Sequence, residues 1–341
     1  MNKITFLEFT SHAHDFLQSL FLVLDKNKIV IEKNWNIDHL CYRTTTDADY
    51  VETKKYFFEF SKLLIESEVN GRLISTFKLQ RPIQYQDWTI DLVELTAPKI
   101  GKQPQGGFEH IEVVVDVPFD AIKKRFAHCQ FDESGLKKDF NQELEINFGA
   151  MAIKFHYLSL SSVINVEKNV ELFQALKQLN IFSEFKNFSP LISGTFPLDI
   201  QIENSDVDIL MQTDDLVGLQ NLLHFKYGQH KHYHSTIVKN PNGRALVVDF
   251  EYAGFVFEVY AEDKPTVLQN SNLHFILEER ILKLATADFR NKILELKKSC
   301  IKTEPAFAQV LKISGDAYTG MIDFQKKSET EIKKSLTKNS V

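Results

Sequence analysis

The stretch Gly194-Thr195, followed about ten residues later by Ser205-Asp206-Val207-Asp208-Ile209, carries the most information in this chain. Side chains on a strand alternate between its two faces, so Asp206 and Asp208 point the same way while Val207 points into the core. Two carboxylates held close together repel each other unless a cation lies between them. Oxygen ligands of this kind suit Mg²⁺, which can also bind phosphates. The pattern therefore predicts a metal site on a strand.

The residues upstream of the two acids add a phosphate-binding element. Gly194 lets the backbone approach a phosphate closely, and the Thr195 hydroxyl, Ser205 and nearby N–H groups can bind one. An Asp-x-Asp pair alone occurs often by chance, but a Gly-Thr pair at this distance makes the combination more specific. The whole set is typical of a nucleotidyltransferase active site.

A site of this type needs a third acid from a neighbouring strand. Glu258 is our first choice, because it stands among large apolar residues in Phe255-Val256-Phe257-Glu258-Val259-Tyr260. Asp249 and Glu251 are the second and third choices. Glu258 would complete the metal site and could help to deprotonate an acceptor hydroxyl. The alternative is that the chosen acid caps a turn or faces solvent on an edge strand.

Composition bounds the classes of function. The 341 residues suffice for about two domains, and 43% hydrophobic and 25% charged residues are ordinary for a globular protein. A net charge of −6 gives no strong signal for nucleic-acid binding. The three cysteines favour a reducing compartment, and neither a cleavable signal pattern nor an apolar run near 20 residues is present. We therefore expect a cytoplasmic protein that does not contact membranes.

The first part of the chain shows a repeated pattern. We expect a helix over residues 5–24, a strand over 37–43, a helix over 49–67 and strands over 72–79 and 88–95. After a Gly- and Pro-rich loop the pattern restarts with a strand over 108–115, a helix over 119–127 and strands over 143–148 and 150–157. The sequence therefore predicts two βαβββ modules facing each other, in a domain that covers residues 1–165.

The second domain is expected over residues 166–325. Strands are expected over 198–201 and 206–211, a helix over 215–225, three strands between 233 and 260, and helices from 273 to 311. Residues 326–341 form a polar tail that we expect to fray. The predicted fold class is α+β, with the paired modules followed by an α/β domain and C-terminal helices.

Four residues occupy corresponding places in the two modules. His39 and His110 each follow an acid at the start of an apolar strand, and Glu94 and His156 each stand on a module's last strand. Histidines and a carboxylate around one cavity suit a divalent transition metal such as Zn²⁺. The alternative is that each histidine is a buried residue with a single hydrogen bond.

The sequence allows more than one role for three histidines and for the residues at the start of one helix. His230, His232 and His234 could line one face of a strand and bind a metal, although a solvated polar edge is the more common arrangement. Lys231 and Lys239 could instead supply positive charge for a phosphate. Gln269, Asn270 and His274 could touch a base or an acceptor, or serve only the start of a helix.

The C-terminal half, residues 170–323, resembles an uncharacterised domain family of the polymerase-beta-like nucleotidyltransferase superfamily. The similarity rests on Gly194-Thr195-Phe196-Pro197-Leu198, Ser205-Asp206-Val207-Asp208-Ile209, the Glu258 strand, Val267–His274, Lys302–Phe307 and Gly315-Asp316-Ala317-Tyr318. The resemblance implies a nucleotidyltransferase-type fold and attack by an acceptor on the α-phosphate of a nucleoside triphosphate. It implies no particular acceptor.

Residues 1–165 resemble the YecM family of the vicinal oxygen chelate superfamily. The similarity rests on Ile37–Arg43, Asn70–Ile74, Phe77-Lys78-Leu79, Val93-Glu94-Leu95, Gly107–Glu112 and Ile153-Lys154-Phe155-His156. Enzymes of that superfamily use a metal to polarise two neighbouring substrate oxygens. The resemblance places the metal ligands at His39, Glu94 and His110, with His156 where a fourth, often acidic, ligand would lie.

Three functions follow from these patterns. The first is a fusion of a metal-binding domain and a Mg²⁺-dependent nucleotidyltransferase that acts on a nucleoside triphosphate and a small-molecule acceptor. The second is a protein that binds metal and nucleotide without turnover. The third is an N-terminal metal-dependent lyase, isomerase or dioxygenase.

Overall fold

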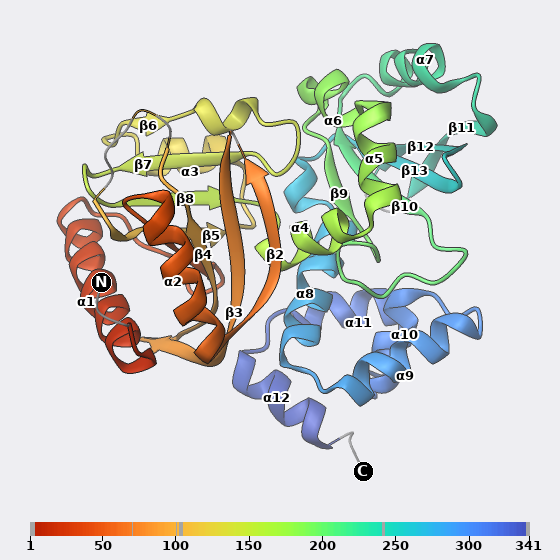
Figure 1. Ribbon diagram of the computed structural model, residues 1–341. Coiled ribbons are helices and arrows are strands. Elements are labelled where there is room, and N and C mark those ends of the chain that lie inside the picture. Colours follow the sequence, from red (N-terminus) through yellow and green to blue (C-terminus); the bar gives the residue numbers. More distant parts are fainter. Residues whose placement is uncertain (1–3, 70, 100, 102–104, 241–242, 339–341) are drawn as a thin grey trace. The chain divides into compact units, whose positions relative to one another are not determined.

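The computed structural model describes residues 4–69, 71–99, 101, 105–240 and 243–338. Its internal contacts divide the chain into two compact units, residues 1–160 and 161–341, and each unit has its own β-sheet (Figure 1). The expected α+β fold class is confirmed. The domain boundaries expected from the sequence at residues 165 and 325 stay predictions.

The first unit is built on an eight-stranded sheet in the order β2-β3-β4-β1-β5-β8-β7-β6. Each half of this sheet is one βαβββ module, and β1 and β5 pair antiparallel at the centre. The first module comprises β1 (Asn36–Arg43), α2 (Asp47–Phe60), β2 (Ser61–Val69), β3 (Arg72–Tyr85) and β4 (Trp88–Thr96). The second comprises β5 (Gly107–Val114), α3 (Phe119–Arg125), β6 (Phe131–Asp132), β7 (Glu143–Asn147) and β8 (Ala152–His156).

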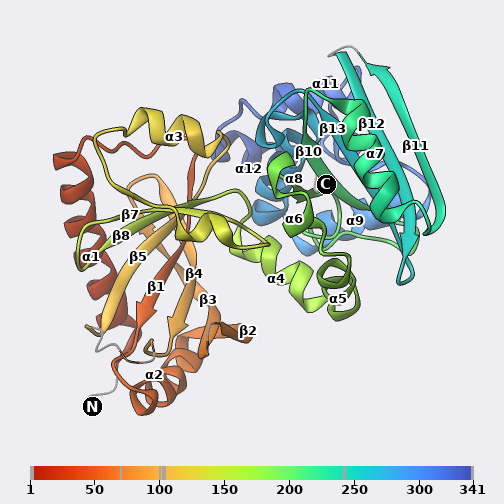
Figure 2. The ribbon, with the colours of Figure 1, turned by 90° about the horizontal axis from the view of Figure 1, so that it is seen from above.

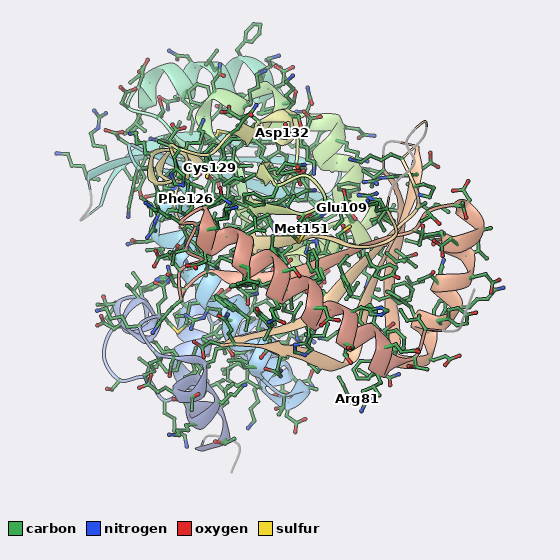
Figure 3. All side chains as sticks on the ribbon, turned by 90° about the vertical axis from the view of Figure 1, so that its left-hand side faces the viewer. Arg81, Glu109, Phe126, Cys129, Asp132 and Met151 are labelled. Carbon is green, nitrogen blue, oxygen red and sulfur yellow. The ribbon has the colours of Figure 1, made fainter. Side chains whose placement is uncertain are left out.

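Helix α1 (Phe6–Lys26) packs on this sheet at β3 and β5 (Figure 3). Thr5 and Glu8 form a capping box that begins the helix, because each side chain accepts a hydrogen bond from the other residue's backbone N–H. The buried face repeats at helical spacing through Phe9, Ala13, Leu17, Leu20 and Leu24. This face forms one side of the core of the first unit.

Strand β2 was missing from the sequence prediction. The expected helix over 49–67 is wrong in its second part, because α2 ends at Phe60 and the chain continues as β2. Ser61 turns to an extended conformation (φ −147°, ψ 167°), and the strand pairs with β3 from Ser61↔Leu79 to Val69↔Arg72. The hydrogen-bonded ladder with β3 overrides the helix-like local pattern.

The second unit contains a five-stranded sheet in the order β11-β12-β13-β10-β9, with α7 packed on β11 and β12 (Figure 2). The strands are β9 (Leu191–Ser193), β10 (Val207–Gln212), β11 (Lys231–Asn240), β12 (Gly243–Tyr252) and β13 (Phe255–Glu262). The helices are α4 (Leu160–Lys168), α5 (Val170–Leu179), α6 (Ile181–Glu184), α7 (Leu216–Tyr227), α8 (Asn270–Leu284), α9 (Ala287–Lys298), α10 (Thr303–Val310), α11 (Ala317–Phe324) and α12 (Glu329–Lys338).

Two further expectations for this unit are corrected. Residues 198–201 form no strand, because the segment folds into turns in which Asp199 N–H bonds to Phe196 C=O and Ile200 N–H bonds to Thr195 C=O. The strand of this region is β9, which lies upstream. The tail does not fray up to residue 338, because α12 packs on α8 and buries Ile332. Residues 339–341 lie outside the described residues.

None of the helices in the described part of the chain combines the length and apolar character needed to cross a lipid bilayer.

Candidate functional sites

Three carboxylates meet at one end of the second sheet. Asp208 on β10 lies beside Glu258 on the parallel strand β13, and Asp206 directly precedes β10. One oxygen of each of the three carboxylates lies within 4.8 Å of the other two. The structure therefore brings together the two acids of the Asp-x-Asp motif and the expected third acid.

The pKa values of these acids show the cost of placing them together. Burial, followed by the charges of Asp206 and Glu258, raises the pKa of Asp208 well above its usual value. Burial and the charges of Asp206 and Asp249 raise the pKa of Glu258 to about 7. A divalent cation among the three oxygens would remove this repulsion, and carboxylate oxygens are ligands that Mg²⁺ prefers. The residues present thus fit a magnesium ion.

Gly194 follows β9 and lies directly against the acidic cluster. Its φ of +72° favours glycine, and a Cβ built on it would come 1.8 Å from Asp208 Oδ2. The next residue, Thr195, is buried, and its Oγ1 has no hydrogen-bond partner among the described residues. An unsatisfied buried hydroxyl is costly, so Thr195 is suited to bind a ligand such as a phosphate.

Ser205 has a local structural partner. Its Oγ accepts a hydrogen bond from the Ile202 N–H at 2.9 Å, and its own N–H donates to the Ile202 C=O at the same distance. These bonds shape the turn that leads into Asp206. The structure therefore gives Ser205 a role in the loop, and its expected contact with a nucleotide stays a prediction.

The acidic face continues beyond Glu258 onto β12 and β11. Asp249 lies opposite Glu258, and His234 lies opposite Asp249 with its Nδ1 3.8 Å from Asp249 Oδ2. Burial raises the pKa of Asp249, and the charge of Asp206 raises it further. Glu251 lies two residues along the same strand, where its Oε1 is 3.7 Å from His232 Nε2. Asp249 and Glu251, the alternatives to Glu258 as the third acid, therefore both lie on β12, the strand next to that of Glu258.

The three histidines near β11 do not form a regular row. His232 has a φ of +55°, and the register with β12 shifts between Lys231 and His234. The His230 ring stacks on Tyr227 and Phe250 and lies edge-on to Tyr252, on the face of β12 opposite Asp249. The metal site considered for these histidines thus lacks the required geometry in the described structure. Lys231 and Lys239 are exposed.

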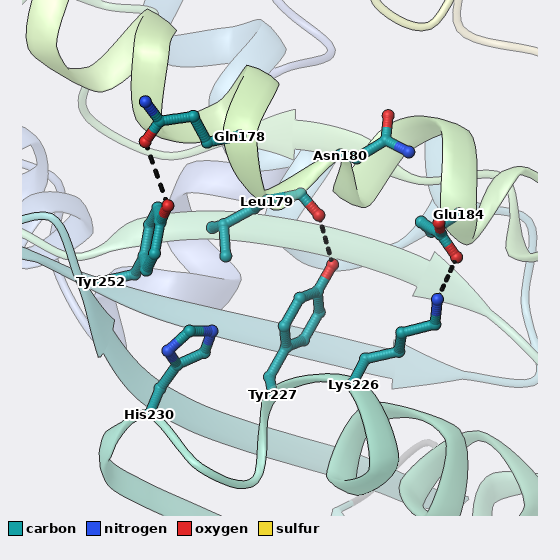
Figure 4. Close-up of a pocket in the computed structure, with 8 residues that line it drawn as sticks. All are labelled: Gln178, Leu179, Asn180, Glu184, Lys226, Tyr227, His230 and Tyr252. Carbon is teal, nitrogen blue, oxygen red and sulfur yellow. Dashed lines mark hydrogen bonds and ion pairs between the residues drawn. The ribbon is translucent and has the colours of Figure 1, made fainter.

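A cavity of about 300 Å³ opens beside His230 (Figure 4). The two tyrosine hydroxyls that line it are already paired: Tyr252 Oη donates to Gln178 Oε1 at 3.0 Å, and Tyr227 Oη donates to the Leu179 C=O at 3.0 Å. Lys226 and Glu184 form an ion pair at 2.6 Å. Because Tyr252 and Asp249 point to opposite faces of β12, this cavity is separate from the acidic cluster.

Near the start of α8, the side chain of Gln269 is hydrogen-bonded to the backbone, whereas Asn270 and the Nε2 atom of His274 have no assigned role. Gln269 Nε2 donates to the Met211 C=O at 2.8 Å and to the Lys264 C=O at 3.0 Å, so it ties the end of β10 to the loop before the helix. Asn270 is exposed. His274 Nδ1 lies 3.3 Å from Glu304 Oε1, and its buried Nε2 has no partner among the described residues.

A second cluster lies in the first unit, on the adjacent strands β4, β1, β5 and β8. His39 Nε2 is 3.8 Å from Glu94 Oε2 and 3.6 Å from Glu112 Oε2. His156 Nε2 is 3.7 Å from the same Glu112 oxygen. Ligand atoms around a tetrahedral zinc ion are separated by roughly 3.3 Å, given bonds of about 2.0–2.1 Å. The spacing of these atoms is a few tenths of an ångström longer.

The two histidines are oriented as metal ligands usually are. His39 Nδ1 lies 2.9 Å from Asp38 Oδ2, and His156 Nδ1 contacts the Leu158 C=O. Both rings are buried, and neither Nε2 has a hydrogen-bond partner among the described residues. Metal-bound histidines typically donate their other ring N–H to a carboxylate or a backbone carbonyl. The residues therefore fit a divalent transition metal.

His110 lies behind this cluster and next to Glu112. Its Nε2 is 3.1 Å from Glu112 Oε1, and Lys154 Nζ is 3.3 Å from the same oxygen. Burial and the charge of Lys154 lower the pKa of His110 to about 4, so the ring is neutral at pH 7. The structure groups His39 and Glu94 with Glu112, and it groups His110 with Cys41 and Glu109.

Charge in this cluster is balanced mainly through Glu112. Although burial opposes ionisation, Lys154 and His39 hold the pKa of Glu112 well below its usual value. Burial would lower the pKa of His39, but Glu112 and Asp38 raise it above the usual range. Glu112 was missing from the ligands expected from the sequence. The sequence did contain a signal for Glu112, because side chains alternate along a strand and residues 110 and 112 therefore lie on the same face of β5.

Two family models match the two halves of the chain. The model for the YecM protein matches residues 7–150, and the model for a domain of unknown function, DUF4269, matches residues 174–324. The N-terminal half is YecM-like. The C-terminal half is DUF4269-like. Protein YecM of Escherichia coli (strain K12) is 29% identical over 147 residues, which are 39% of this chain and 78% of that protein. The expected family resemblances are confirmed.

Two solved structures each resemble part of the chain. Methylmalonyl-CoA epimerase of Streptomyces coelicolor, in complex with 2-nitronate-propionyl-CoA, is 14% identical, with 36% of this chain and 96% of that chain covered and a TM-score of 0.28. The Cid1 poly(U) polymerase with MgGTP bound is 12% identical, with 46% of this chain and 48% of that chain covered and a TM-score of 0.30.

Proposed function

We propose that the DUF4269-like half is a Mg²⁺-dependent nucleotidyltransferase with Asp206, Asp208 and Glu258 as its metal-binding acids. The observation that carries this proposal is the meeting of the three carboxylates within 4.8 Å, against a glycine that leaves no room for a side chain. The unsatisfied Thr195 hydroxyl supports a phosphate contact beside the acids. The substrates would be a nucleoside triphosphate and a small-molecule acceptor.

The proposed reaction is a substitution at the α-phosphorus. The acceptor oxygen forms a bond to the α-phosphorus, the bond to the bridging oxygen breaks, and pyrophosphate leaves with the electron pair. The acceptor proton passes to Glu258, whose carboxylate lies beside those of Asp206 and Asp208. When bound, Mg²⁺ supplies Lewis-acid stabilisation of charge on the phosphate oxygens. Gly194, which has no side chain, lets the backbone lie close to these phosphate oxygens.

The test uses labelled nucleoside triphosphates, Mg²⁺ and a metabolite extract, with the full chain. Asp208→Asn removes a charge from the cluster while preserving shape, so we expect loss of transfer and of tight Mg²⁺ binding. Asp214→Asn is the matched control, because Asp214 is exposed in the loop after β10. Transfer at the normal rate by Asp208→Asn would refute the proposal. Nucleotide binding without turnover in the wild type would favour a non-catalytic binding protein.

We propose a second function for the YecM-like half, the binding of a divalent transition metal such as Zn²⁺. It is supported by two buried imidazoles whose Nδ1 atoms have hydrogen-bond partners, while their Nε2 atoms have no hydrogen-bond partner in the described structure and lie 3.6–3.8 Å from carboxylate oxygens. His39, Glu94, Glu112 and His156 would hold the metal, and His110 would orient Glu112. A metal there would polarise substrate oxygens in a lyase, isomerase or dioxygenase reaction.

Metal analysis of the purified protein tests this second proposal. We expect about one equivalent of transition metal in the wild type and much less in His39→Ala. His12→Ala, on the exposed side of α1, is the control for a general effect of removing a histidine. Equal metal content in His39→Ala and the wild type would contradict the site. An assay for turnover would follow only after metal is found.

A further inference from the structure

The cavity beside His230 has aromatic rings on one side and the amides of Gln178 and Asn180 on the other (Figure 4). Three ring contacts hold the imidazole of His230. Its plane lies within 26° of the Tyr227 and Phe250 rings, at centroid distances of 5.9 and 5.6 Å, and it meets the Tyr252 ring at 61° and 5.0 Å. A wall of packed rings favours a ligand with a flat aromatic face.

Two hydrogen bonds fix the walls of this cavity without a ligand. Tyr252 of β12 is bonded to the Gln178 side chain, and Tyr227 of α7 is bonded to the Leu179 C=O, each at 3.0 Å. Both tyrosines are therefore tied to the end of α5. A ligand that enters a cavity already held in shape has a smaller ordering cost to overcome.

The cavity also has polar groups that the protein leaves available. The Gln178 amide uses its Oε1 to accept from Tyr252, and its Nε2 has no partner among the described residues. The ring nitrogens of His230 likewise make no hydrogen bond within the described part of the chain. A neutral imidazole offers one donor and one acceptor, and an amide nitrogen offers two donors. These groups suit a ring whose edge carries both donors and acceptors.

Charge and size narrow the class of ligand further. Lys226 and Glu184 line the cavity as an ion pair at 2.6 Å, so their charges offset each other. The described lining therefore offers a phosphate chain no lysine or arginine that lacks a counter-ion. The volume of about 300 Å³ is at the lower end of the range of roughly 300–1,000 Å³ for small-molecule sites. Both observations favour a small, neutral ring system.

We propose that this cavity binds a neutral nucleobase. The base packs against the aromatic wall, and its edge bonds to Gln178 Nε2 and to a ring nitrogen of His230. Amide side chains commonly bond to base edges, and aromatic side chains commonly stack on bases. The site lies on the face of β12 opposite Asp249, so it is distinct from the acidic cluster and does not rest on the proposed nucleotidyltransferase function.

The test is a ligand-observed NMR titration of the full chain with adenine, hypoxanthine, cytosine and uracil. We expect at least one base to bind with a dissociation constant of about 1 mM or tighter. Gln178→Leu removes the amide, and His230→Phe keeps an aromatic ring but removes its nitrogens. Each variant loses one hydrogen bond to the base, so we expect its affinity to fall about threefold or more.

Gln174→Leu is the matched control, because Gln174 is exposed one turn earlier on α5 and does not line the cavity. We expect it to bind the base like the wild type. Thermal unfolding without ligand identifies any variant that does not fold, and Gln178→Leu decides the outcome if His230→Phe is unfolded, because Gln178 is exposed. The inference is overturned if no base binds, if both folded variants bind like the wild type, or if Gln174→Leu loses as much affinity as they do.

A phosphate on the ligand tests the argument from charge. We expect adenosine monophosphate to bind this cavity no more tightly than adenosine, because Lys226 is already paired with Glu184. The comparison is made in the wild type and in Gln178→Leu, so that only binding that depends on Gln178 is counted. Tenfold tighter binding of the monophosphate through Gln178 would show that the cavity takes a nucleotide and would overturn the assignment to a neutral base.

Discussion

Single residues decide how closely the acidic cluster can approach the backbone. Gly194 combines a positive φ with a position where a Cβ would meet the Asp208 carboxylate at 1.8 Å. Gly254 also has a positive φ, of +85°, but a Cβ there would meet nothing within 4 Å. A comparison of Gly194 with Gly254 therefore distinguishes two reasons why a position requires glycine: a positive φ, which both share, and a close contact, which only Gly194 has.

We predict that Gly194→Ala lowers both stability and Mg²⁺ affinity, while Gly254→Ala lowers only stability. The backbone conformation costs about 1–2 kcal/mol for a residue with a Cβ at either position. Only at Gly194 must Asp208 also move, which displaces one of the three proposed metal-binding oxygens. Chemical denaturation and Mg²⁺ calorimetry measure the two effects. Unchanged Mg²⁺ affinity in a folded Gly194→Ala would contradict the proposed position of the metal.

At the level of elements, strand register decides which side chains meet. In the first unit, His39 pairs in register with Glu112 across β1 and β5, whereas His110 pairs with Cys41. Both His110 and Glu112 lie on one face of β5, so the local pattern alone cannot choose between them. The register places Glu112 beside His39. His110 lies beside Cys41 instead, and its ring contacts Glu112.

We predict that Glu112→Gln removes bound transition metal, while His110→Asn weakens binding only about 10- to 100-fold. Glu112 would be a direct ligand, and His110 would act through its contact with Glu112, as outer-shell partners of metal ligands do. Metal titration of both folded variants gives the comparison. A greater loss in His110→Asn than in Glu112→Gln would instead favour the ligand set expected from the sequence.

The helix α2 is joined to the first sheet through Glu66 on β2. Tyr50 of α2 and Ser75 of β3 donate to Glu66 at 2.7 Å, and Lys54 of α2 pairs with it. Burial would raise the pKa of Glu66, but these bonds outweigh it and lower the pKa to about 2. A lowered carboxyl pKa stabilises the fold above the ordinary value near 4.5, and this stability is lost as the pH falls towards 2.

We predict that Glu66→Gln loses less stability than the wild type when the pH falls from about 5 to 2. The variant lacks the carboxylate whose protonation weakens the folded state, so the difference between the two proteins shrinks over this range. Denaturant unfolding at several pH values gives the free energies of unfolding. Glu59→Gln is an exposed control on α2. A difference that is constant with pH would contradict the assigned pKa.

At the scale of the whole molecule, each candidate site lies within one compact unit. The acidic cluster belongs to the five-stranded sheet, and the histidine cluster belongs to the eight-stranded sheet. Each unit buries its own apolar residues.

We predict that the two sites respond independently to substitution. Asp208→Asn should leave the transition-metal content unchanged, and His39→Ala should leave Mg²⁺ and nucleotide binding unchanged, because substitutions at sites in separate compact units usually act additively. The double variant should show the sum of the single effects within about 0.5 kcal/mol. Metal analysis and nucleotide calorimetry on all three variants test this. Coupling well beyond that margin would mean that the two halves share an equilibrium.

The sequence by itself determined the α+β class, the paired βαβββ modules, the family resemblances of both halves and the Asp-x-Asp pair with its candidate third acid. These predictions rest on local periodicity and on short spacings between residues, which can be read without knowing which distant residues pack together. Even so, the strand β2 was read as helix, because pairing with β3 outweighs the local preference of residues 61–67.

Only the tertiary structure decided that Glu112 lies beside His39 and that Asp208 leaves no room beside Gly194. Each of these depends on residues far apart in the sequence. A shift of one residue in strand register moves every side chain to the other face. The register between β1 and β5 joins residues about 70 positions apart and is not fixed by a hairpin turn, as in His39↔Glu112.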